Sequence, residues 1–181
     1  MTLSQEDGQL YYKLWLPLLD FVNRKYRINS KMKSMATAKG LDPAEVKEVA
    51  DKLWSDVTII DDYLKENEDL SEEHTEIIRS WKRRIQGTFL MERHLKKGTI
   101  FISLENEEVY QVSGIVSSWE EMFYGAPMPL MLEATFMPFR DVIISDGLVM
   151  PYNILVGGGM KRMVKDVYMA AKKNGRIHRT L

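Results

Sequence analysis

The glycine-rich segment near residue 157 has the residue types and spacing best suited to bind a ligand. Gly157, Gly158 and Gly159 follow a predicted strand and open a predicted helix, with Lys161 and Arg162 immediately beyond. Amide groups at a helix N-terminus attract anions, and nearby cations strengthen that attraction. The glycine spacing matches neither the P-loop nor the dinucleotide fingerprint. We therefore interpret these five residues as a candidate site for sulfate, phosphate or a partner carboxylate.

The same glycines also have a purely structural explanation. Glycine allows sharp turns and close packing of backbone, and a lone glycine-rich turn is weak evidence for a ligand. We expect this packing explanation to hold, with the three glycines buried against neighbouring backbone.

Charge is distributed unevenly along the chain. Residues 42–76 contain 13 acidic and 3 basic residues, a net charge of −10. Residues 159–181 contain 7 basic residues and one acidic residue, Asp166, a net charge of +6. Two interpretations remain open: two solvated faces that attract each other within or between molecules, which we favour, or a basic C-terminal third that binds RNA or DNA. A strand face with Phe89, Phe101 and Tyr110 would suit base stacking, but these residues fit a core at least as well.

Residues for catalysis or metal binding do not cluster in the sequence. The three histidines, His74, His94 and His178, are scattered and lack metal-binding spacing. The acidic residues Glu133, Asp141 and Asp146 would have to converge on one cation to support a metal-dependent hydrolase, which we keep as an alternative. We predict no catalytic residue, metal ligand or cofactor from the sequence.

The overall composition narrows the class of protein. Apolar residues make up 45% and charged residues 28% of 181 residues, with a formal net charge of −1, as in ordinary globular proteins. The absence of cysteine excludes disulfides, thiol catalysis and cysteine zinc sites, and fits a reducing compartment. Because neither a signal peptide nor a spanning apolar run is evident, we expect a cytoplasmic protein without a membrane partner.

The elements that position these residues fall into two regions. Helical spacing over residues 5–26, 42–54, 59–64 and 71–85 predicts an N-terminal helical region, residues 1–86, with Asp42 and Ser71 as caps. Near Gly87 the period falls to about two, which predicts helix up to Ile85 and strand from Thr88. Trp81, on the last helical stripe, is expected to pack where the helices meet the strands.

The second predicted region, residues 87–181, is rich in strands. Short strands are expected at residues 88–93, 99–104, 108–116, 130–137 and 142–144, with a helical turn capped by Ser118. An Asp146-Gly147 hairpin turn would lead to a return strand over residues 148–154. The last helix is expected over Met160 to Lys173. The predicted fold class is α+β: a helical region, then an antiparallel β meander or small barrel, then a C-terminal helix.

Two runs of the sequence resemble known proteins. They are residues 81–97, which include WKRRIQGTF and RHLKK, and residues 130–159, which include PFRDVIISDGL and YNILVGGG. Together they resemble a group of uncharacterised bacterial proteins that join an N-terminal helical region to a small β-rich domain. The resemblance implies a fold arrangement and supplies no catalytic residue.

The sequence favours a non-catalytic intracellular binding or interaction protein, whose partner is another protein or a second copy of the chain. The alternatives are an anion- or nucleic-acid-binding protein that uses the basic C-terminal third, and a metal-dependent hydrolase. An enzyme is the less favoured class.

Overall fold

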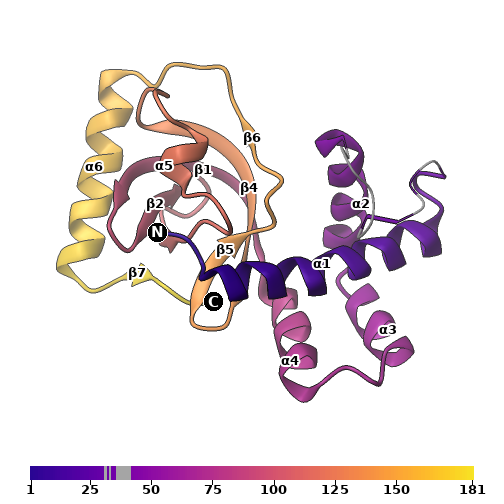
Figure 1. The fold of residues 1–181 in the computed structure, drawn as a ribbon. Coiled ribbons are helices and arrows are strands. Elements are labelled where there is room, and N and C mark those ends of the chain that lie inside the picture. The colour runs from indigo at the N-terminus through magenta and orange to yellow at the C-terminus, as the bar shows by residue number, and fades with distance from the viewer. Residues whose placement is uncertain (31, 33, 36–41) are drawn as a thin grey trace. The chain divides into compact units, whose positions relative to one another are not determined.

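The computed structural model describes residues 1–30, 32, 34–35 and 42–181 (Figure 1). The fold is α+β, as predicted, and the chain divides into two compact units. Gln5–Lys82 form the helical unit, and Met1–Ser4 with Arg83–Leu181 form the barrel unit. The first four residues belong with the barrel because Thr2 bridges to Gly114 and the Leu3 amide donates to the Gly114 carbonyl at 2.9 Å. The sequence had placed all of residues 1–86 in the first region.

The helical unit contains four helices among its described residues: α1 (Gln5–Tyr26), α2 (Pro43–Ser55), α3 (Ile59–Glu66) and α4 (Glu72–Ser80). Both predicted caps are present. The Asp42 side chain accepts a hydrogen bond from the Ala44 amide, and Ser71 accepts one from the His74 amide. Such bonds satisfy amide groups that the first helical turn leaves without a partner.

Aromatic side chains hold the helical unit together. Trp15 of α1 stacks on Trp54 of α2, with ring centroids 5.4 Å apart, and meets Trp81 edge to face at 5.6 Å. Trp81 also contacts Tyr11 and is 0% exposed. The burial of Trp81 follows the prediction, and the neighbours that bury it include two residues of α1.

The helix-to-strand change occurs earlier than predicted. Helix α4 ends at Ser80, a 3₁₀ turn covers Trp81–Arg83, and strand β1 begins at Ile85. The prediction of helix up to Ile85 and strand from Thr88 is therefore wrong by several residues. Pairing of Ile85 with Phe136 of a distant strand sets the start of β1, and helical periodicity carries no information about that pairing.

The barrel unit follows, with strands and helices in the chain order shown in Figure 1. Its elements are β1 (Ile85–Leu95), β2 (Gly98–Ser103), β3 (Val109–Val112), α5 (Trp119–Met122), β4 (Leu130–Phe139), β5 (Val142–Ser145), β6 (Met150–Pro151), α6 (Gly158–Lys173) and β7 (Ile177–His178). Helix α5 begins with the predicted Ser118 cap, which forms a reciprocal capping box with Glu121.

Five of these strands close into a barrel. β1 pairs with β2, β2 with β3, β3 with β5, β5 with β4, and β4 again with β1. The β3–β5 contact is parallel and the other four are antiparallel, so the β unit is the small barrel of the prediction rather than a simple meander. This strand order, with a short helix between β3 and β4, is that of the five-stranded Greek-key barrel called the OB-fold.

The predicted Asp146-Gly147 hairpin is wrong. The hairpin joins β4 to β5 through Arg140 and Asp141, and Arg140 has a φ of 50°. The segment after Gly147 pairs with β4 through β6 instead of with β5. Asp146 still forms a local turn, because its side chain accepts a hydrogen bond from the Leu148 amide at 3.0 Å.

Strand side chains alternate between the inside and the outside of the barrel. The buried inner cluster consists of Phe89, Met91, Phe101, Tyr110, Val112, Trp119, Leu130, Leu132, Ala134, Phe136 and Ile143. A second cluster joins the outward side chains of β1, β2 and β3 to α6 and β7: Leu90, Ile100, Ile102, Val109, Val164, Tyr168, Ala171 and Ile177. Among the helices that the structure describes, none has the length and apolar character needed to cross a bilayer.

We expect Trp81→Ala to lower the free energy of unfolding of the helical unit by about 3–5 kcal/mol, because it removes a large buried ring and leaves a cavity. Denaturant unfolding followed by circular dichroism measures this loss. Tyr26→Ala, which truncates a partly exposed aromatic residue of the same unit, is the control, with an expected loss below about 1 kcal/mol. Equal losses in the two variants would contradict the central position of Trp81.

Candidate functional site on the basic face of helix α6

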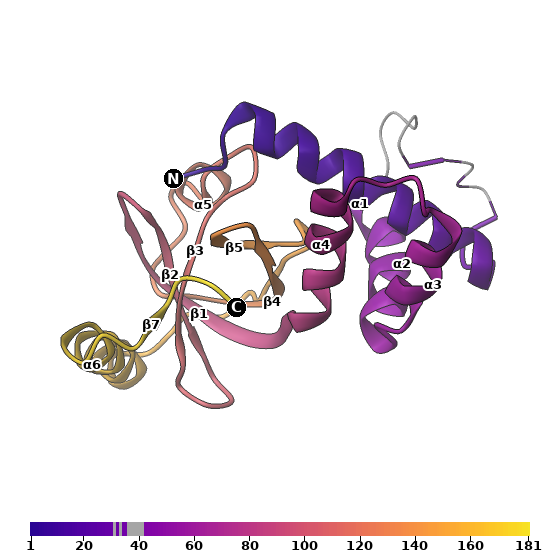
Figure 2. The ribbon, with the colours of Figure 1, turned by 90° about the horizontal axis from the view of Figure 1, so that it is seen from below.

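Helix α6 lies against the outside of the barrel (Figures 1 and 2). Its buried residues, Val164, Tyr168 and Ala171, follow helical spacing and pack on the outward side chains of β1, β2 and β3. Beyond its C-terminus, β7 pairs in parallel with β3. The apolar face of α6 is therefore used for packing, and its polar face is left to solvent.

The polar face of α6 is basic. Its five cations, which we call the α6 cations, are exposed: Lys161, Arg162, Lys165, Lys172 and Lys173. Helical geometry places three of the lysines in one row and the remaining two cations in a second row about a quarter turn away, over about 18 Å of helix. Among the described residues, none of the five forms an ion pair with a carboxylate.

The three glycines open α6 on this exposed side. Gly157 is the N-cap residue, with φ −72° and ψ 162°, and Gly158 and Gly159 form the first turn. Added Cβ atoms would meet nothing within 4 Å at any of the three, and none has a positive φ. The expectation that they lie buried against neighbouring backbone is therefore wrong. Neither close packing nor a left-handed backbone in the described structure requires glycine there.

Arg93 of β1 lies close to α6 but, unlike the α6 cations in the described structure, it pairs with a carboxylate. Its guanidinium stacks over the Tyr168 ring at 4.4 Å and also pairs with Glu92. Hydrogen bonding to Glu92 raises the pKa of Arg93 above its usual value. Arg93 thus helps to hold Tyr168 against the barrel.

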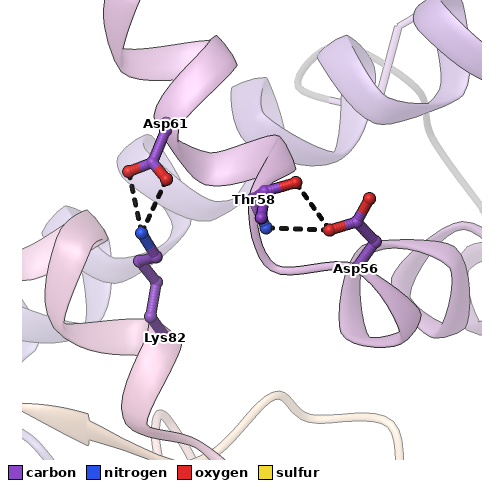
Figure 3. A network of polar contacts seen from close by, with 4 residues as sticks. All are labelled: Asp56, Thr58, Asp61 and Lys82. Carbon is purple, nitrogen blue, oxygen red and sulfur yellow. Dashed lines mark hydrogen bonds and ion pairs between the residues drawn. The ribbon is translucent and has the colours of Figure 1, made fainter.

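Residues 42–76, which we call the acidic segment, differ from α6 because several of their carboxylates have ion-pair or hydrogen-bond partners nearby (Figure 3). Lys82 Nζ lies 2.8 and 2.7 Å from the two carboxylate oxygens of Asp61, and the Asp56 carboxylate accepts hydrogen bonds from the Thr58 hydroxyl and amide at 2.6 and 3.1 Å. The hydrogen bond from the Thr58 hydroxyl is the main reason that the pKa of Asp56 is lowered. The hydrogen bond from Lys25 lowers the pKa of Asp62 in the same way. Part of the acidic charge is therefore balanced inside the helical unit.

The residues considered for a metal-dependent hydrolase do not form a cluster. Glu133 lies on β4 and Asp141 in the turn after it, and the strand between Glu133 and Phe139 alone spans about 20 Å. Asp146 is buried at a local turn. Within the described part of the chain, no group of three or more His, Cys, Asp or Glu side chains is placed to hold a metal ion.

The histidines occupy separate places as well. His94 Nδ1 lies 2.9 Å from Thr99 Oγ1 across the β1–β2 hairpin, and His178 Nε2 lies 2.7 Å from a Glu108 oxygen. His74 lies in the first turn of α4. These contacts are local and polar, and none of them brings two histidines together.

Sequence reasoning identified only the beginning of the basic face. Lys161 and Arg162 belong to the predicted site because they follow the glycines, whereas Lys165, Lys172 and Lys173 contribute only to the predicted net charge of the C-terminal segment. Their spacing along one helix was the available signal, since positions 161, 165 and 172 fall on one side of an α-helix.

We predict a specific pH dependence for the barrel from His94. Burial lowers the pKa of His94. Below about pH 6.5, His94 therefore binds a proton more readily in the unfolded chain than in the folded barrel. The free energy of unfolding should therefore decrease as the pH falls from 7.5 to 5.5, and the decrease should be smaller in His94→Gln. Urea unfolding at both pH values measures this, and an unchanged decrease in the variant would contradict the assignment to His94.

Comparisons of the chain with protein-family models, with curated proteins and with solved structures found no match. The resemblance to bacterial proteins with a helical region and a β-rich domain stays a prediction.

Proposed function

We propose that this protein is a non-catalytic binding protein whose barrel unit holds an anionic polymer, nucleic acid, on the basic face of α6. The observation that carries the proposal is the set of five exposed α6 cations without a described carboxylate partner, on a helix fixed by its buried face. A cytoplasmic location belongs to the same proposal, because a chain without cysteine suits a reducing compartment.

The charge pattern in the first half of α6 opposes the stability of the helix, whereas Lys172 and Lys173 lie in the last turn, where the helix dipole favours cations. Lys161 ends the first turn and Arg162 begins the second, close to the end where the helix dipole favours acidic residues, and α6 has no acidic residue in its first turn. Each of α1 to α5 does have acidic residues in its first turn. Lys161 and Lys165 also repel each other at an i, i+4 spacing. An external anion would offset all of these unfavourable terms.

The triple glycine supports the same proposal. Glycine loses more backbone freedom on folding than other residues, and no contact in the described structure explains three in succession. A phosphate can approach the backbone amides closely where no side chains intervene. We therefore include Gly157, Gly158 and Gly159 with Lys161 and Arg162 in the proposed surface.

A second candidate is self-association through charge. Residues 42–76 have a net charge of −10 and residues 159–181 a net charge of +6, so two copies would attract each other head to tail. The local partners of Asp61 and Asp62 weaken this case, because part of the acidic charge is already balanced. Sedimentation velocity at low and high salt tests for such assembly.

Fluorescence anisotropy with a labelled 20-bp duplex tests the main proposal. We expect salt-dependent binding, because phosphate contacts release counterions. Lys165→Gln/Lys172→Gln should weaken binding at least about tenfold at 0.1 M salt and reduce the slope of log K against log salt by about 2. Lys13→Gln/Lys65→Gln is the matched control, since both lysines are exposed in the helical unit, and it should behave as the wild type. No binding by the wild type at 50 mM salt, or an equal loss in the control, contradicts the proposal.

A further inference from the structure

We infer that α6 binds the phosphate backbone of double-stranded nucleic acid without reading its sequence, and that the outer β2–β3 face of the barrel does not bind single strands. This inference rests on the proposed function and names its substrate class. It departs from what the strand order alone would suggest, since barrels of this topology bind oligonucleotides on the β2–β3 face.

The aromatic residues that would stack on bases lie inside the barrel. Phe89, Phe101 and Tyr110 are 2%, 0% and 7% exposed and belong to the inner cluster. The idea that they stack bases is therefore wrong, because strand alternation turns them inward. Stacking of bases on aromatic side chains supplies much of the affinity for single strands, and these residues do not provide it.

The outer face of β1, β2 and β3 is closed to a ligand. Its side chains at Leu90, Ile100, Ile102 and Val109 are aliphatic and buried beneath α6. Val156, just before the glycines, packs on the same cluster, and β7 pairs with β3 beyond the other end of α6. A nucleic acid that bound this outer face would have to displace α6. The chain is held to the barrel on both sides of this helix, by Val156 before it and by β7 after it.

The exposed side of α6 offers charge without stacking surface. Apart from its cations it carries glycine, methionine, alanine and Asp166, and the one aromatic residue of the helix, Tyr168, is buried. Lysine side chains without orienting partners act as point charges, which suits phosphates better than base edges.

A duplex fits this surface better than a single strand. Duplex DNA carries one negative charge per about 1.7 Å of axis, against about 3.4 Å for one strand. The two rows of α6 cations, about a quarter turn apart, can also reach phosphates of both strands. Binding of a duplex therefore gains from the higher charge density of the DNA. Binding of a single strand lacks the base stacking that usually compensates for its lower charge density.

Anisotropy with the full chain at a fixed salt concentration tests this inference. The probes are GC-rich and AT-rich 20-bp duplexes, dT20 and dA20 single strands, and heparin as a competitor. We expect the two duplexes to agree within about threefold and both single strands to bind at least about tenfold more weakly. Tighter binding of either single strand than of the duplexes, or a preference above tenfold between the duplexes, overturns the inference. Failure to bind any probe overturns the proposed function itself, whereas displacement of a bound duplex by heparin is expected for contacts to the phosphate backbone.

A double variant tests for single-strand binding elsewhere on the barrel unit. Tyr124 and Tyr152 are 91% and 42% exposed, lie outside α6 and are available for stacking. Tyr124→Ala/Tyr152→Ala should leave the affinities for both duplexes and for dT20 within twofold of the wild type. A selective loss of dT20 binding would place a stacking surface on these tyrosines and contradict the account.

Discussion

The pairing of β1 with β4 closes the barrel, and the rest of the barrel unit depends on it. The ladder runs from Ile85 opposite Phe136 to Met91 opposite Leu130. β1 also pairs with β2, and a register shift between Met91 and Arg93 interrupts that second ladder. Eleven residues give β1 the length to contact both neighbours. Closure removes the free edges that an open sheet of these strands would expose.

Closure also determines what α6 can do. Once alternate side chains fill the inside, the apolar side chains that point outward from β1, β2 and β3 still need cover. Val164, Tyr168 and Ala171 supply that cover, which fixes the orientation of α6 about its own axis. The α6 cations then face solvent as a consequence of packing. The basic face of α6 and the face that packs on the barrel are thus two sides of one helix.

Local signals in the sequence were sufficient for much of the fold. Caps at Asp42, Ser71 and Ser118 identified three helix starts, because each side chain bonds to an amide only two or three residues away. The parallel β3–β5 pair and the β1–β4 ladder join residues far apart in the chain, so no local pattern contains them. Asp146-Gly147 was misleading for the same reason: the dipeptide forms a turn, but distant pairing with β4 decides where the chain goes next.

The charge of the candidate surface could be predicted from the sequence, but the exposure of its residues could not. The excess of cations after residue 159 is a property of the sequence. Which side of α6 is buried depends on the barrel, and so does the open space where side chains of Gly157, Gly158 and Gly159 would lie. The inward direction of Phe89, Phe101 and Tyr110 likewise follows from barrel closure, which the strand pattern left open between a meander and a barrel.

A ¹H–¹⁵N NMR titration of the full chain with an unlabelled 16-bp duplex tests most directly whether the exposed face of α6 is the binding surface. Amide resonances report the site of contact without any substitution in the chain. We predict that the largest shifts fall within residues 157–173, with strong effects at Gly158, Gly159 and Lys165, while amides of β2 and β3 change little. Largest shifts in the helical unit, or in β2 and β3 with loss of the α6 packing, would contradict this prediction.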